Sequence, residues 1–413
     1  MFDEIYYKKH MTEKQRWLSR KYLLYRMFSS MWFFGTVWLY FYRLYITDQQ
    51  VGLLDGMAFA IGLLAEVPSG ALADKFGRDK MVRLGQTLLA SGILIQAINS
   101  SFTPFFIGQA IMMIGFGFIS GADDALFFEN LKFKRDSTSW RKLVTRGQQF
   151  ALTATLTATV IGGWLHTINP RIPWILTSLA FVLATFFIWP IKDTRPKNAR
   201  RRFAEEVKSY LQDIKMGFSQ FRLPQLKPYV PIILIVQGLF YAVGYGLLRI
   251  ILLDRFTFSP FWGAVAVAVC GIITVWALSI LHKQADSLSE KRVLMVVSFS
   301  AAAALLLSIA NIGLWGFVVI LTLSTGEYVL QPFMSEVLNK HAPERYRATV
   351  LSVGSFLRIL PYTLLAPIIG YLNTNGQLQY FLLAWALLVC GAAILYVLSK
   401  RRDSKVSIEN PTS

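Results

Sequence analysis

Twelve stretches of about twenty mostly apolar residues recur along this chain, and they constrain its fold more than any other feature. A bilayer core about 30 Å thick needs roughly 20 helical residues, because each residue of a helix rises about 1.5 Å. Each stretch is therefore long enough to cross a membrane as one helix. The predicted spans are residues 23–45, 51–69, 82–101, 103–126, 147–167, 172–191, 229–253, 260–281, 293–311, 313–335, 349–371 and 378–399.

The composition agrees with a membrane protein and argues against a soluble one. Hydrophobic residues make up 54% of the 413 positions and charged residues only 16%, whereas soluble domains carry about 25% charged residues. The net charge of +18 could suggest nucleic acid as a partner, but there is no basic module on a polar scaffold. We therefore expect membrane lipid, and no nucleic acid, among the partners.

The positions of the basic residues predict the orientation of the spans. Of the 42 Lys and Arg residues, 37 lie in the two termini, in every second connection, or in the first turn of a span that adjoins them, as expected for the cytoplasmic side. Only Arg43, Arg171, Arg249, Arg255 and Arg358 lie elsewhere. The pattern predicts a multi-pass protein of the plasma (inner) membrane with both termini in the cytoplasm.

The longest connection divides the chain near its midpoint. The expected parts are an N-terminal six-helix bundle (1–191), a cytoplasmic linker (192–228) and a C-terminal six-helix bundle with a short cytoplasmic tail (229–413). A helical period of apolar residues from Phe203 to Phe221 predicts an amphipathic linker helix, either on the membrane surface or solvated. Asp74 and Asp286 begin similarly spaced charged segments in the two halves, as an internal duplication predicts.

The connection after the second span carries a recognisable motif, Gly70-Ala-Leu-Ala-Asp74-Lys-Phe-Gly77-Arg78-Asp79-Lys80. It resembles the signature loop of the major facilitator superfamily. The resemblance implies an all-α fold of twelve transmembrane helices in two six-helix halves with pseudo-symmetry. It also implies that Asp74 and Arg78 form a conformational latch between the halves. Gly70 and Gly77 are expected to permit a tight return of the chain with close helix approach.

Two ionisable residues lie deep in the predicted spans of the second half. Counting residues from the helix ends places Glu327 and Arg358 at a similar depth on neighbouring spans. The segment Gly326-Glu327-x-x-x-x-Pro332 resembles one found in some multidrug antiporters of the superfamily, where the intramembrane Glu contributes to proton coupling. An ion pair of the two residues is either a static contact or a protonation switch, because intramembrane charges are costly.

A second charged cluster lies near the predicted cytoplasmic side of the first half. Asp123 and Asp124 are candidate proton sites, but adjacent residues point about 100° apart on a helix and cannot share one partner. The alternative interpretation is an inner gate of ion pairs, to which three further residues belong, Arg26, Glu66 and Glu129. Asp55 and Arg249 are predicted to lie within about a turn of the outer surface and to reach it by snorkelling.

Aromatic residues are frequent on the first and seventh spans, which line the central cavity if the resemblance holds. Rings with few charges suit an amphipathic or cationic aromatic substrate, although helix packing and lipid contact account for many of them. The candidate cavity residues are Trp32, Phe34, Trp38, Gln237, Phe240, Tyr241 and Tyr245.

The sequence therefore predicts a secondary active transporter that exports amphipathic or drug-like small molecules in exchange for protons by alternating access. The alternatives are a proton-coupled uptake symporter for a metabolite, which would need a polar, charge-matched cavity, and a non-transporting receptor or scaffold. We expect no cofactor and no metal site, because the four His and two Cys are scattered. An enzyme is disfavoured, because no nucleophile–base pair or phosphate-binding Gly loop is found.

Overall fold

The computed structural model describes residues 12–131, 137–194, 212, 214–283 and 289–409, and their regular secondary structure is entirely helical. Packing divides the chain into two compact units. Unit 1 contains the described parts of residues 1–41 and 58–209, and unit 2 those of 42–57 and 210–413. Residues 42–57 therefore pack with helices from the second half of the sequence.

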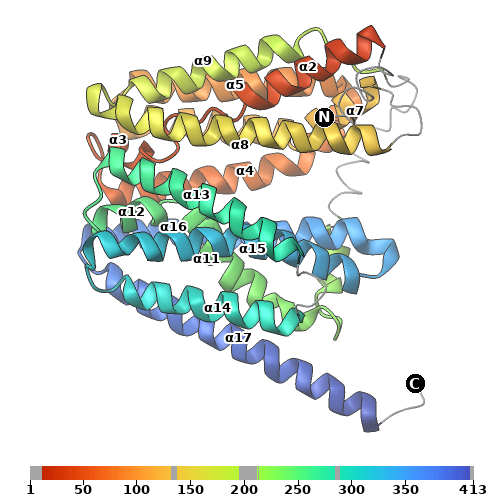
Figure 1. Cartoon of the computed structure of the whole chain (residues 1–413), viewed down its shortest axis with the longest axis vertical. Helices are drawn as coiled ribbons and strands as arrows, with labels where there is room; N and C mark the ends of the chain where they lie inside the picture. The colour runs from red at the N-terminus through yellow and green to blue at the C-terminus, as the bar shows by residue number, and fades with distance from the viewer. Residues whose placement is uncertain (1–11, 132–136, 195–211, 213, 284–288, 410–413) are drawn as a thin grey trace. The chain divides into compact units, whose positions relative to one another are not determined.

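Unit 1 is a bundle in which α5 lies against α6 and α9, and α2 lies against α8 and α9 (Figure 1). Its core contains the buried rings of Tyr22, Tyr25 and Phe127. Glycines on α5 and α6 allow close approach, since a Cβ at Gly115 would lie 2.7 Å from the Gly85 carbonyl oxygen. The helices are α2 (Glu13–Phe28), α4 (Asp48–Phe76, whose first part belongs to unit 2), α5 (Arg78–Ile98), α6 (Phe102–Ile119), α7 (Ala122–Leu131), α8 (Ser137–Ile168) and α9 (Ile172–Ile188).

Unit 2 is a second bundle, in which α14 packs against α17 and α15, and α16 packs against α11 and α15. The short helix α3 (Trp38–Tyr42) and the start of α4 lead into it. The remaining elements are η1 (Lys227–Tyr229), η2 (Ile232–Gln237), α11 (Gly238–Gly244), α12 (Leu248–Arg255), α13 (Pro260–Lys283), α14 (Glu290–Leu307), η4 (Gly313–Trp315), α15 (Gly316–His341), η5 (Glu344–Tyr346), α16 (Arg347–Thr374) and α17 (Leu378–Glu409).

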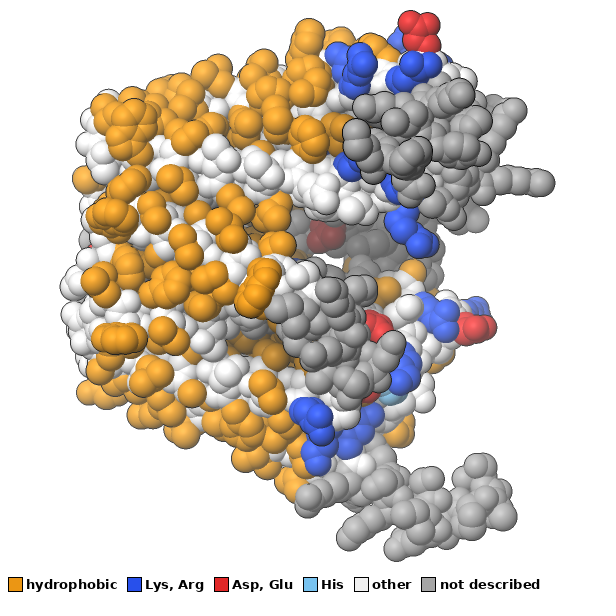
Figure 2. Space-filling view, in the orientation of Figure 1, with side chains coloured by type: hydrophobic (Ala, Val, Ile, Leu, Met, Phe, Trp, Pro, Cys, Tyr) orange, Lys and Arg blue, Asp and Glu red, His pale blue; other side chains and the backbone are white. Residues whose placement is uncertain are grey.

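Each of the twelve predicted spans corresponds to a helix or a run of short helices, which confirms the predicted fold class. Among the described residues, eight helices are long and apolar enough to cross a membrane. Figure 2 shows apolar side chains along the flanks of the helices, whereas Lys and Arg gather towards one end of each unit. Exposed aromatic residues such as Trp164 and Trp276 suit contact with lipid.

Three spans are interrupted, which the hydropathy pattern does not predict. The fourth breaks at Ser120-Gly121 between α6 and α7, where Gly121 has φ +71°. In the first, α2 ends at Phe28 and the chain turns irregularly before α3. In the seventh, a π-helical segment (η2) precedes α11, and a break at Tyr245-Gly246-Leu247 separates α11 from α12. Irregular backbone inside a span is found mainly where it is buried in protein or lines a cavity.

Most of the predicted linker helix, residues 203–211 and 213, lies outside the described residues. Residues 214–220 are helical. Phe218 packs edge-on against Phe356 of α16, with ring centroids 5.7 Å apart.

Candidate functional site

The most deeply placed ion pair of unit 2 joins α15 to α16. Nη1 of Arg358 lies 3.3 Å from Oε1 of Glu327, and both side chains are mostly buried. The Arg358 guanidinium also stands over the ring of Tyr241, 5.2 Å from its centroid. Gly244 faces Glu327, where a Cβ would lie 3.4 Å from the Glu327 Cγ, so a larger residue would crowd the carboxylate.

The other predicted cavity residues of the seventh span take different positions. Gln237, Phe240 and Tyr241 are buried within unit 2, whereas Tyr245 has 58% of its surface exposed. The Phe240 ring fills the space beside Gly326, where a Cβ would overlap it. In this structure Phe240 is used in helix packing and Gln237 is buried, so neither side chain is exposed to a cavity. Tyr245 alone of these side chains is open to a ligand.

The aromatic residues of the first span are also used mainly in packing. Phe34 is buried and stacks on Trp174 of α9, with centroids 4.0 Å apart and an interplanar angle of 6°. Trp32 is stacked on Phe116 of α6 at 5.4 Å. Phe34 is therefore a core residue of unit 1 and not a cavity residue, whereas Trp32 and Trp38 are partly exposed.

The two adjacent aspartates of α7 have separate tyrosine partners on α2. The Tyr25 hydroxyl donates to Oδ2 of Asp123 at 3.1 Å, and the Tyr22 hydroxyl donates to Oδ1 of Asp124 at 3.1 Å. Arg26 Nη1 lies 3.8 Å from Asp123 Oδ2. This arrangement links α2 to α7 through both hydroxyls, as the rotation of about 100° between neighbouring residues requires.

Arg78 of the signature loop binds two acidic residues inside unit 1. Its guanidinium lies 2.6 Å from Oε1 of Glu129, and its backbone N–H donates to Oδ2 of Asp193 at 2.9 Å. The Asp193 carboxylate thus lies at the N-terminus of α5, a favourable place for a negative charge. The Glu66 carboxylate is exposed and joins no ion pair among the residues that the structure describes.

The two glycines of the loop differ in role. Gly77 has φ +99° at the turn between α4 and α5, a conformation that favours glycine. Gly70 lies within α4, which continues to Phe76, and a Cβ there would meet nothing within 4 Å. The prediction that Gly70 permits a tight return is therefore wrong, and the turn is made at Gly77. Asp74 is exposed on the last turns of α4.

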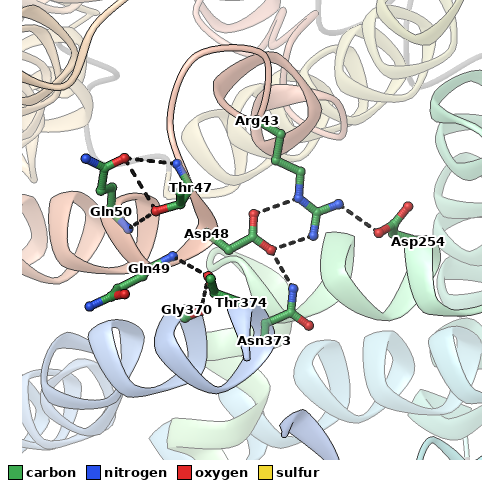
Figure 3. Close-up of polar contacts among 9 residues, drawn as sticks. All are labelled: Arg43, Thr47, Asp48, Gln49, Gln50, Asp254, Gly370, Asn373 and Thr374. Atoms are coloured by element: carbon green, nitrogen blue, oxygen red, sulfur yellow. Dashed lines mark hydrogen bonds and ion pairs between the residues drawn. The ribbon is translucent and has the colours of Figure 1, made fainter. Parts of the chain in front are cut away.

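Unit 2 contains a polar cluster that joins the turn after α3, which carries Arg43, to α4, α12 and α16 (Figure 3). Nε and Nη2 of Arg43 both bind the Asp48 carboxylate at 2.7 Å, and Nη1 lies 2.8 Å from Oδ2 of Asp254. Asn373 Nδ2 also donates to Asp48, and the Gln49 N–H donates to Oγ1 of Thr374 at 2.9 Å. Bidentate Arg–carboxylate contacts are among the stronger polar contacts in proteins.

Beyond this polar cluster, α4 and α16 meet along a seam of small residues. A Cβ at Gly52 would overlap the Ala366 carbonyl oxygen, and one at Gly370 would overlap the Asp48 carbonyl oxygen. A Cβ at Gly56 would lie 2.8 Å from the Thr363 carbonyl oxygen. The backbones are therefore in direct contact through a small-xxx-small pattern on each helix.

Asp55 lies beside this seam and is buried. The prediction that it reaches the outer surface by snorkelling is therefore wrong. Asp55 is only 2% exposed and accepts a hydrogen bond from the Tyr362 hydroxyl, which in turn accepts from the Leu247 N–H at 3.0 Å. Snorkelling fails because the seam buries this face of α4. A sequence pattern that could have indicated this burial is the spacing of small residues four apart, Gly52 and Gly56 on α4 and Ala366 and Gly370 on α16.

Metal-binding geometry is not found among the described residues, where no three His, Cys, Asp or Glu side chains converge.

Two bundles of apolar helices, eight of them among the described residues long enough to cross a membrane, are typical of secondary transporters. The model of the Major Facilitator Superfamily matches residues 22–364, and the chain belongs to that family. Among curated relatives, the Bacillus subtilis (strain 168) MFS-type transporter YxaM is 22% identical over 92% of this chain and 96% of its own. Multidrug resistance protein 2 of the same organism is 20% identical over 88% of this chain and 90% of its own.

Solved transporters share the fold at low sequence identity. The nucleoside transporter NupG superposes with a TM-score of 0.73 at 12% identity, over 94% of this chain and 99% of NupG. A peptide transporter POT in complex with sulfate gives a TM-score of 0.72 at 13% identity, over 95% of each chain.

Proposed function

We propose that this protein is a proton-coupled exporter of amphipathic or drug-like small molecules that works by alternating access. The observation that carries the proposal is the buried pair of Glu327 and Arg358. Breaking such a pair by removing one partner typically costs about 3–5 kcal/mol. A proton on Glu327 removes its charge without removing the side chain, so that protonation can change the contact reversibly during a transport cycle.

The direction of transport is supported by a relative. Multidrug resistance protein 2 of Bacillus subtilis matches 88% of this chain at 20% identity. The exposed ring of Tyr245 beside the Glu327–Arg358 pair suits an amphipathic substrate. Asp123, Asp124 and Arg26 serve in this proposal as an inner gate, because each acidic side chain already has a fixed tyrosine partner.

Alternating access requires a packed surface that opens in one state. The seam between the start of α4 and the end of α16 is the proposed closure on the outer side, because its backbone contacts depend on close fit. At the end of these helices, the ion pairs of Arg43 with Asp48 and Asp254 would stabilise the closed seam. The signature loop with Gly77, Asp74 and Arg78 is the proposed latch on the cytoplasmic side.

The direct test is uptake into inside-out membrane vesicles with an acidic lumen, using a panel of fluorescent amphipathic compounds. Uptake of at least one compound should rise with the pH gradient and fall when nigericin collapses it. Vesicles without the protein give the background. Uptake that depends on the protein but not on the gradient would contradict proton coupling.

A first prediction concerns the latch. Asp74→Asn should slow transport several-fold while leaving substrate affinity within about twofold, because Asp74 is exposed at the end of α4 and belongs to no proposed binding surface. Initial rates at several substrate concentrations separate the two effects. Asp403→Asn, the same substitution in the C-terminal helix, serves as the control. Normal turnover of Asp74→Asn at equal expression would exclude a conformational role for the loop.

A second prediction concerns the orientation in the membrane. In a variant with Cys270 and Cys390 replaced by serine, Asn198→Cys should react with an impermeant maleimide only from the cytoplasm. Asn169→Cys should react only from outside. The basic connections predict this result, because Lys and Arg gather in cytoplasmic loops. Reaction of both cysteines from the same side would overturn the twelve-span topology.

A further inference from the structure

Arg249 is an intramembrane cation that the proposed coupling pair does not use. It is the second residue of α12 and is partly buried, and its Nε atom is enclosed without a hydrogen-bond partner. The structure gives it no ion pair within the described part of the chain. A charged side chain within a span that turns into the protein and lacks a charged partner is by default a sign of function.

Snorkelling does not account for this side chain. The Cα–Cβ bond of a helical residue leans towards the N-terminal end of its helix, so Arg249 leans towards Tyr245 and away from Arg255. Consistent with this direction, the Tyr245 and Tyr328 hydroxyls and the Cys270 thiol lie near its guanidinium. Cys270 lies ten residues into α13 from Pro260, well inside the bundle.

Two exposed aromatic side chains lie near Arg249. Tyr245 is 58% exposed and Tyr328 is 53% exposed, so both rings can meet a ligand. The break between α11 and α12 lies at Tyr245 itself, and interrupted helices mark binding sites in many transporters. Glu327, the acidic residue next to Tyr328, is already paired with Arg358. Arg249, Glu327 and Arg358 therefore carry two guanidinium groups for one carboxylate. The next carboxylate, that of Asp55, is already bound by the Tyr362 hydroxyl.

This charge balance favours an anion over a cation as the ligand. The Tyr241 ring, a natural place for a cationic substrate, already carries the Arg358 guanidinium over its face. The planar guanidinium of an arginine matches a carboxylate and can bind both of its oxygens. A ligand that brings its own carboxylate would supply the partner that Arg249 lacks.

We propose that Arg249 binds the carboxylate of an amphipathic aromatic substrate whose rings pack against Tyr245 and Tyr328. This inference names the substrate class of the proposed exporter and in that respect rests on the proposed function. The aromatic surfaces bind the apolar part, and the guanidinium selects the charged end.

The test compares acids with their uncharged amides. Binding to the purified full-length protein in detergent at pH 7 is measured calorimetrically for naphthalene-2-carboxylate and biphenyl-4-carboxylate, each beside its carboxamide. The wild-type protein should bind each carboxylate roughly tenfold or more tightly than its amide. Arg249→Gln should remove that preference and weaken carboxylate binding by about ten- to a hundredfold, the range of a charge-assisted hydrogen bond. Amide binding should change by less than about twofold.

Two matched variants complete the test. Arg249→Lys should keep part of the preference, because it keeps the charge, and Arg255→Gln should keep all of it, because Arg255 binds the backbone carbonyls of Ser308 and Ile309. The proposal is overturned by equal binding of acid and amide, by no binding of either compound, by a preference that survives Arg249→Gln, or by equal loss of both ligands. Since no gradient is imposed, failure of proton coupling leaves this result unaffected.

Discussion

Gly52→Ala should reduce transport about tenfold or more, although alanine stabilises an isolated helix better than glycine. The added Cβ would overlap the carbonyl oxygen of Ala366 on α16, and this oxygen belongs to backbone that cannot move aside. Overpacking typically costs about 1–3 kcal/mol, and about 1.4 kcal/mol changes an equilibrium tenfold. The closed seam should therefore lose population, and the cycle that passes through it should slow.

The matched control is Gly391→Ala on α17, where the new Cβ meets nothing within 4 Å; its transport should stay normal. Opening of the seam can be measured with Thr363→Cys, since Thr363 is 8% exposed, in a background without the two native cysteines. An impermeant maleimide should label this cysteine faster in the Gly52→Ala variant. Unchanged labelling and unchanged transport together would show that the seam does not take part in the cycle.

Glu327→Gln should abolish gradient-driven accumulation while leaving substrate exchange without a gradient largely intact. Glutamine keeps the size of the side chain and can still accept a hydrogen bond from Arg358, but it cannot exchange a proton. Uptake into inside-out vesicles with and without an imposed pH gradient measures the effect. Glu327→Asp should retain some gradient dependence, because it keeps a titratable carboxyl group on α15.

Glu344→Gln is a suitable control, because the Glu344 side chain is 92% exposed and lies 3.9 Å from Arg347 in an exposed ion pair. A comparison of thermal unfolding guards against misfolding, since Gln at position 327 leaves the Arg358 charge without a charged partner. If the Glu327→Gln protein still concentrates substrate in response to the gradient, Glu327 is a structural residue. Asp123 is then the next carboxylate to test.

The fold could be predicted from the sequence because bilayer thickness sets span length and the basic loops alternate. The interruptions could not be predicted. The break at Tyr245-Gly246-Leu247 depends on Tyr362, whose ring occupies the space beside Gly246 and whose hydroxyl accepts from the Leu247 N–H. Hydropathy averaged over a span contains no information about such a partner from another helix.

For the candidate site, the sequence predicted how deep each residue lies along its helix but not which way its side chain points. Counting residues was enough to place Glu327 and Arg358 at one level, where the structure brings their atoms to 3.3 Å. Rotation of a helix about its axis was not predictable, because span 1 and span 7 carry aromatic residues on most faces. Phe34 and Phe240 are therefore buried in the structure. Asp55 is bound by the Tyr362 hydroxyl, 307 positions away in the sequence.

The coupling of substrate to protons is tested most directly by the proton movement that a substrate gradient drives. Proteoliposomes are loaded with the compound that shows the strongest gradient-dependent uptake and with a pH-sensitive dye, and then diluted into substrate-free buffer of equal pH. An antiporter exchanges departing substrate for entering protons, so the lumen should become acidic with the wild-type protein. It should not do so with Glu327→Gln or in protein-free liposomes. A lumen that stays at constant pH, or becomes alkaline as in a symporter, would contradict proton-coupled export.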